Sequence, residues 1–192
     1  MRVRLLLAGL IGLALAMPTT ARADQFTEAL KRAESSYAAG KYDQTLNAMF
    51  DALYHAWDKS PFLLTSMLLV QEPAKGYGLY EPRTSNAYKP GEKMFIYAEP
   101  AAYGFKRSGD RYEFGFAVDF SVATEEGKIL GGQKDFGSFS FNSRVANTET
   151  MLNVTLTISG LDPGRYVLEL TIHDKIGNGA VTRTLPFTIA GG

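Results

Sequence analysis

The residues best suited to recognition or chemistry lie between positions 72 and 105. Two nearly repeated phrases occur there, EPAKGYG at 72–78 and EPAAYG at 99–104. Tyrosine gives contact area at low entropic cost and arginine gives directional hydrogen bonds, so aromatics mixed with arginine and carboxylates in Gly- and Pro-rich loops are typical of a recognition surface. The candidate binding residues are Tyr77, Tyr80, Glu81, Arg83, Glu99 and Tyr103.

The same stretch also has a purely structural interpretation. Pro73, Pro82 and Pro100 cannot donate to a central ladder, so they mark strand edges and exits. The run Lys89-Pro90-Gly91-Glu92 is typical of a turn into a strand. Both interpretations stay open, and the structural one is favoured.

No catalytic signature stands out beside this cluster. His55 and His173 are the two histidines, and they form no Ser-His-Asp order and no His-x-x-His pair. Catalysis would require Glu81 with Glu99, or His173 with Asp174, to converge in a pocket. No phosphate-binding loop or EF-hand spacing occurs. We therefore expect no catalytic residues, no metal site and no cofactor, with a carboxylate-based hydrolase as the least favoured class.

The first 23 residues have the pattern of a secretory signal peptide. Arg2 and Arg4 precede an apolar run at 5–16, and Ala21-Arg22-Ala23 is a small-x-small cleavage site. The run is shorter than the roughly 20 residues that span a bilayer. The sequence predicts a periplasmic or secreted protein without a transmembrane anchor after cleavage.

Composition narrows the class of partner. The chain has a formal net charge of zero and no cysteine. The sequence lacks the basic stripe that would indicate nucleic-acid binding. The lack of cysteine excludes disulfides, thiol nucleophiles and thiolate metal sites. Asn153-Val154-Thr155 matches a glycosylation sequon, but it lies in a strand-like run. The expected partners are an envelope protein or a glycan.

Residues 24–60 have the spacing of two amphipathic helices. Apolar residues recur at 26, 30, 33 and 37, then at 46, 49, 50, 53, 54 and 57, with Gly40 between the stripes. The stretch AESSYAAGKYDQTLNAMFDAL at 33–53 resembles a tetratricopeptide repeat, with Gly40 and Tyr42 at the turn and Met49 and Ala52 at packing positions. A single copy cannot form a solenoid. A hairpin that packs on the rest of the chain is favoured, and a docking platform for a partner is the alternative.

Residues 61–192 have the alternation of β-strands. Inward-facing apolar positions alternate with polar ones at 112–122, 151–158, 166–172 and 181–189, with shorter candidates at 94–98 and 136–141. Residues 62–70 are apolar on both sides, which leaves strand or helix open and favours a strand. About seven strands with Gly and Pro turns predict a mainly β fold, an antiparallel sandwich.

One turn refines this prediction. The segment LDPGRY at 161–166 resembles the tyrosine corner of immunoglobulin-like and fibronectin type III domains. That resemblance implies a structural role for Tyr166, whose hydroxyl would bond back to the preceding connection. As a whole the chain resembles uncharacterised exported bacterial proteins with an immunoglobulin-like sandwich. We expect a non-catalytic binding protein of the bacterial envelope that uses its Tyr- and Arg-rich loops and its hairpin, with a glycan-binding module as the alternative.

Overall fold

The computed structural model describes residues 24–191, and the chain is mainly β. The helices are α1 (Gln25–Ala38) and α2 (Tyr42–Lys59). The strands are β1 (Leu63–Val70), β2 (Ala87–Tyr88), β3 (Lys93–Ala101), β4 (Lys106–Ser108), β5 (Arg111–Thr124), β6 (Ile129–Ser143), β7 (Leu152–Thr157), β8 (Gly164–Asp174) and β9 (Ala180–Ile189). The predicted class and element order are confirmed. The predicted signal peptide, residues 1–23, lies outside the described residues.

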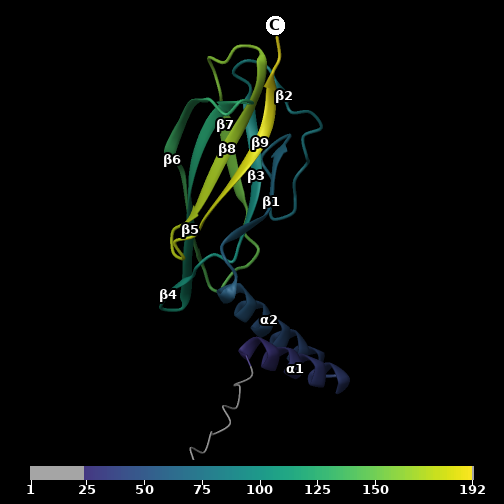
Figure 1. Ribbon diagram of the computed structural model, residues 1–192. Helices are drawn as coiled ribbons and strands as arrows, with labels where there is room; N and C mark the ends of the chain where they lie inside the picture. Colours follow the sequence, from purple (N-terminus) through teal and green to yellow (C-terminus); the bar gives the residue numbers. More distant parts are fainter. Residues whose placement is uncertain (1–23, 192) are drawn as a thin grey trace, which may run out of the picture. The chain divides into compact units, whose positions relative to one another are not determined.

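The strands form two sheets around a shared core (Figure 1). One sheet has the order β1-β3-β7, and the other has β2-β9-β8-β5. Strand β6 pairs with β5 along the edge opposite β8, and the short β4 extends the β8 side. This is the strand order of an immunoglobulin-like sandwich, in which the first, second and fifth main strands face the others.

Alternation places the large side chains of both sheets in the core. Ile96 and Val154 project from one sheet, and Phe116, Val118 and Leu170 project from the other. All five are buried, because successive strand residues point to opposite faces. The strand prediction for residues 62–70 is confirmed, since β1 pairs antiparallel with β3.

The tyrosine corner is present. Tyr166 lies near the start of β8, and its hydroxyl donates to the Asp162 carbonyl at 2.8 Å. The bond fixes the connection that precedes β8, as the resemblance implies. Tyr166 is therefore a structural residue.

The chain divides into two compact units, one ending at Ala52 and the other beginning at Leu53. The boundary falls inside α2 rather than at residue 60. The last turns of α2 belong with the sheets because the Tyr54 hydroxyl donates to the Ala146 carbonyl and the Trp57 indole donates to the Tyr103 carbonyl, both at 2.9 Å. Within residues 24–191, the helices lack the combination of length and apolarity needed to cross a membrane.

Candidate binding surfaces

The loop at 71–83 folds onto the outer face of the β1-β3-β7 sheet. Ala74 of this loop is buried with Val70 and Tyr97 of the sheet in a small cluster separate from the main core. The side-chain amide of Asn153 on β7 accepts from the Ala74 N–H and donates to the Ala74 carbonyl, each at 2.9 Å. The Tyr80 ring lies 4.2 Å from the Tyr97 ring, centroid to centroid. The loop is thus held on the sheet by the hydrogen bonds between the Asn153 side chain and the Ala74 backbone, and by the packing of Tyr80 on Tyr97.

The two EPA phrases meet through Tyr97. Its hydroxyl accepts from the Gly78 N–H of the first phrase and donates to a carboxylate oxygen of Glu99 in the second, both at 2.7 Å. The Thr65 hydroxyl bonds the other Glu99 oxygen at 3.1 Å. Burial raises the pKa of Tyr97 to about 12; the Gly78 bond opposes this rise and Glu99 adds to it. The bonds between the two phrases therefore hold the 71–83 loop against β3.

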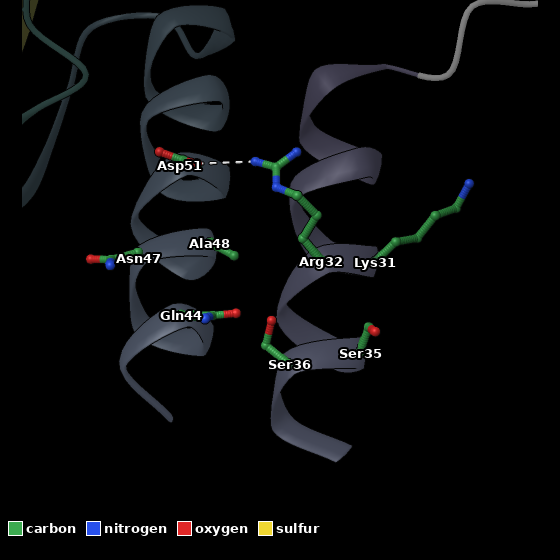
Figure 2. Close-up of a pocket in the computed structure, with 8 residues that line it drawn as sticks. All are labelled: Lys31, Arg32, Ser35, Ser36, Gln44, Asn47, Ala48 and Asp51. Atoms are coloured by element: carbon green, nitrogen blue, oxygen red, sulfur yellow. Dashed lines mark hydrogen bonds and ion pairs between the residues drawn. The ribbon is translucent and has the colours of Figure 1, made fainter. Parts of the chain in front are cut away.

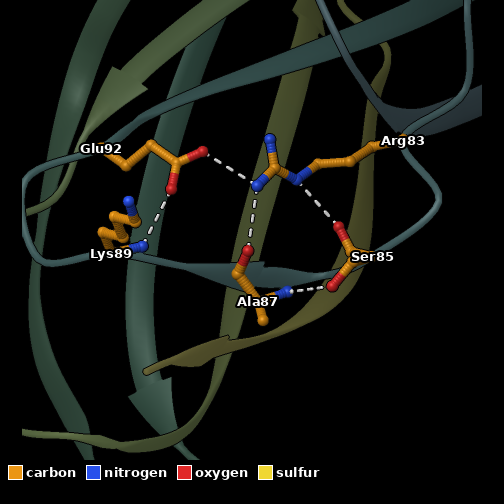
Figure 3. A network of polar contacts seen from close by, with 5 residues as sticks. All are labelled: Arg83, Ser85, Ala87, Lys89 and Glu92. Carbon is orange, nitrogen blue, oxygen red and sulfur yellow. Dashed lines mark hydrogen bonds and ion pairs between the residues drawn. The ribbon is translucent and has the colours of Figure 1, made fainter. Parts of the chain in front are cut away.

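Arg83 lies in an internal network (Figure 3). Its guanidinium donates to the carbonyls of Ser85 and Ala87 at 2.8 and 2.9 Å, and to the Glu92 carboxylate at 2.9 Å. It also lies 4.1 Å from the centroid of the Tyr88 ring. Glu92 in turn accepts the Lys89 N–H, and this bond, followed by Arg83, lowers the Glu92 pKa. All of these donors and acceptors fix the turn that leads into β3.

Tyr103 is buried among aromatic side chains of the core. Its hydroxyl donates to the Asn147 carbonyl and bonds the Thr150 hydroxyl at 2.8 Å. Burial raises its pKa to about 12. Of the six candidate binding residues, Tyr77 and Glu81 are exposed, Tyr80, Arg83 and Glu99 are half-buried with internal partners, and Tyr103 is inaccessible. The structure brings Tyr80 and Glu99 together around Tyr97 and places Arg83 and Tyr103 elsewhere.

His173 and Asp174, one of the two pairs considered for catalysis, have separate partners. His173 Nε2 lies 2.9 Å from the Asp119 carboxylate on the outer face of the β5-β8 sheet. The neighbouring Asp174 is buried and accepts the N–H groups of Gly104 and Ile176 at 2.7 and 2.9 Å. The Asp119 pKa is lowered first by the Asp135 N–H and then by His173. Within residues 24–191, three or more metal-ligating side chains do not gather at any point.

The helical hairpin packs through small residues. The buried positions of α1 and α2 are Ala29, Ala33, Thr45, Ala48 and Ala52. One flank of this contact is a polar groove of about 470 Å³, in which Arg32 bonds Asp51 at 3.0 Å (Figure 2). Its lining residues are Lys31, Arg32, Ser35, Ser36, Gln44, Asn47, Ala48 and Asp51.

The opposite flank carries the large apolar residues, because positions three, four and seven apart share a helix face. We call this flank the hairpin apolar face, and it consists of Phe26, Leu30, Tyr37, Tyr42, Leu46, Met49 and Phe50. Each of these side chains is 37–66 % exposed. The Tyr37 and Tyr42 rings meet edge to face near the turn, 5.7 Å apart. Sequence periodicity found all of these residues except Tyr42, which the tetratricopeptide resemblance placed at the turn. That resemblance also placed Met49 and Ala52 at packing positions; Ala52 is buried in the helix contact, but Met49 is exposed.

The comparisons with known proteins are distant. No protein-family model and no curated protein matches the chain. Among solved structures, the DNA glycosylase AlkC of Pseudomonas fluorescens is 11 % identical over 78 % of this chain and 40 % of its own, with a TM-score of 0.38. A superoxide reductase of Ignicoccus hospitalis is 10 % identical over 66 % and 81 %, with a TM-score of 0.36. The sporulation control protein Spo0M of Bacillus subtilis is 9 % identical over 69 % and 51 %, with a TM-score of 0.35. Likenesses this weak carry no conclusion about function.

Proposed function

We propose that the chain is a non-catalytic, exported binding protein that docks amphipathic helices of a protein partner on its hairpin apolar face. The observation that carries this proposal is the exposure of seven large apolar side chains on one flank of a two-helix element. Contiguous apolar surface of this size marks interaction sites in soluble proteins. The leader-like pattern of residues 1–23 supports an envelope or secreted location.

The chemistry of the face favours helices over glycans. Leu30, Leu46 and Met49 offer no hydrogen bonds to sugar hydroxyls, whereas they fit the apolar positions of a docked helix. Met49 adds an adaptable side chain of the kind used at protein-binding grooves. The spacing of 26, 30 and 37 on α1, beside 46, 49 and 50 on α2, forms two parallel ridges between which a helix can lie.

The loop at 71–83 is at most a smaller contact. Tyr77 and Glu81 remain accessible to a partner. Arg83 bonds internal partners through Nε and one terminal nitrogen, and the Tyr103 hydroxyl is buried and bonded, so we assign them no binding role.

Photo-crosslinking in the exporting cell tests this function. A photoreactive amino acid replaces Phe50 on the apolar face, or Ser36 in the polar groove as the matched control. We expect a discrete protein adduct, identified by mass spectrometry, from position 50 only. Adding Leu46→Asp should abolish that adduct, while Asn47→Asp should leave it unchanged. No adduct from position 50, or equal adducts from both positions, would refute the function. Polysaccharide retention that survives Leu46→Asp would instead favour glycan binding.

A further inference from the structure

We infer that the helices docked on the hairpin apolar face are those of a second copy of this chain, so that two hairpins close into a four-helix bundle. This inference rests on the proposed function, because it names the partner of the same face. A hairpin supplies two helices, each with one apolar flank, which is half of a four-helix bundle.

The exposed area matches what a stable dimer needs. Aromatic side chains bury about 150–250 Å² each when fully covered, and leucine and methionine bury somewhat less. Four aromatic and three aliphatic side chains exposed by 37–66 % therefore present on the order of 800 Å². A standard protein interface buries about 800 Å² per partner. One face placed on its twin therefore reaches the standard size without recruiting any other surface.

The face can meet its own copy without burying charge. It contains leucine, methionine, phenylalanine and tyrosine and no acidic or basic residue. The ion pair of the hairpin contact, Arg32 with Asp51, lies in the polar groove on the other flank. Buried charges would carry a large desolvation cost, and here that cost does not arise.

A two-fold axis also suits the distribution of tyrosines. In an isologous interface the same patch of both copies is used, so a residue at the rim of the interface on one copy also lies at the rim on the other copy. Tyr37 and Tyr42 lie near the turn and are the most exposed members of the face, at 66 % and 62 %. At the end of a bundle their rings pack while their hydroxyls reach water. The aliphatic Leu30, Leu46 and Met49 then occupy its middle.

Sedimentation equilibrium of the leaderless chain across a concentration series tests the dimer. We expect the wild type to dimerise and Leu46→Asp/Met49→Asp to be monomeric, with the dimer dissociation constant raised at least about 100-fold because each buried carboxylate lacks a partner. Gln44→Asp/Asn47→Asp adds the same charge to the same helix in the polar groove and should remain dimeric. Far-UV circular dichroism verifies that each variant keeps its helices.

A disulfide test does not depend on how the aspartate variants fold. The native chain contains no cysteine, so a single substitution reports on one position. Met49→Cys should give a covalent dimer on mild oxidation, and Asn47→Cys should give little. A wild type that stays monomeric at high concentration, or equal linking from both positions, would overturn the second-copy inference. If the photo-crosslink from position 50 then identifies a different protein, the proposed function stands although the second-copy inference fails.

Discussion

Arg83 has a side chain suited to recognition, but its guanidinium bonds partners inside the protein. Its guanidinium bonds two carbonyls and one carboxylate while covering the Tyr88 ring. We expect Arg83→Lys to lower the free energy of unfolding by about 1–2 kcal/mol, because an ammonium group cannot reproduce the planar fork. Urea unfolding followed by fluorescence measures the loss.

Arg144→Lys is the matched control. Arg144 pairs with Asp110 at 2.7 Å, but both side chains are largely exposed. Exposed ion pairs are worth about 0–1 kcal/mol, so this substitution should leave stability nearly unchanged. Equal losses at positions 83 and 144 would contradict the internal role of Arg83.

Tyr97 and Tyr103 should make the protein sensitive to alkali. Both hydroxyls have a pKa of about 12 in the folded chain, while an unfolded tyrosine titrates near 10.0. Their stabilising contribution is complete below pH 10 and is lost as the pH rises to about 12, because only the unfolded state ionises in that window. Urea midpoints measured across this range should fall, and the fall should be smaller in Tyr97→Phe. A pH-independent midpoint would contradict the burial of these hydroxyls.

For single residues, the sequence predicted the structural role of some side chains and not of others. Tyr166 could be assigned because the Asp-Pro-Gly turn before it is a recurring local motif. Tyr103 and Arg83 could not, because a buried and an exposed tyrosine look alike in sequence, and the partners of Tyr103 lie more than forty residues away. Asp119 was likewise missed as the partner of His173, since the two lie on separate strands.

Among the elements, β5 and β6 pack too closely at Gly132 to leave room for a side chain. A Cβ on Gly132 would lie 2.4 Å from the Phe120 carbonyl oxygen, whereas a Cβ on the adjacent Gly131 meets nothing within 4 Å. We expect Gly132→Ala to cost about 1–3 kcal/mol through forced backbone movement. Gly131→Ala should be neutral or stabilise by about 0.4–1 kcal/mol. Thermal unfolding compares the pair, and equal midpoints would contradict this register.

The hairpin shows where periodicity reaches its limit. The spacing correctly predicted two helices and the turn at Gly40, which has a φ of 70°. Periodicity identifies the apolar flank of each helix. It does not show whether that flank packs against the neighbouring helix or lies exposed next to the helix contact. Small residues such as Ala29 and Ala48 bring the helices together and leave the larger side chains accessible. Residues 62–70 resisted a firm prediction because both flanks of β1 meet apolar neighbours, the core on one side and the loop cluster on the other.

Across the whole molecule, stability should be unevenly distributed between the two units. The hairpin contact buries four alanines and a threonine, whereas the sandwich core buries Phe116, Leu168, Ile172 and many other large side chains. Amide hydrogen exchange should therefore be fast in residues 25–52 and slow in β5 and β8. Measured well below the dimer dissociation constant, equal protection of the two units would contradict this distribution. Slower exchange in the hairpin at higher concentration would agree with pairing of its apolar faces.

The clamp between Asn153 and Ala74 bears on the choice of expression host. Asn153 is the first residue of a sequon, and both ends of its amide are held by the backbone of the 71–83 loop. A host that attaches oligosaccharides during translocation would modify this nitrogen before the loop could close over it. The attached sugar would then occupy the place of Ala74 and leave the cluster around Tyr97 open to solvent. Production without asparagine-linked glycosylation, or with Thr155→Val to remove the sequon while keeping Asn153, avoids this misfolded form.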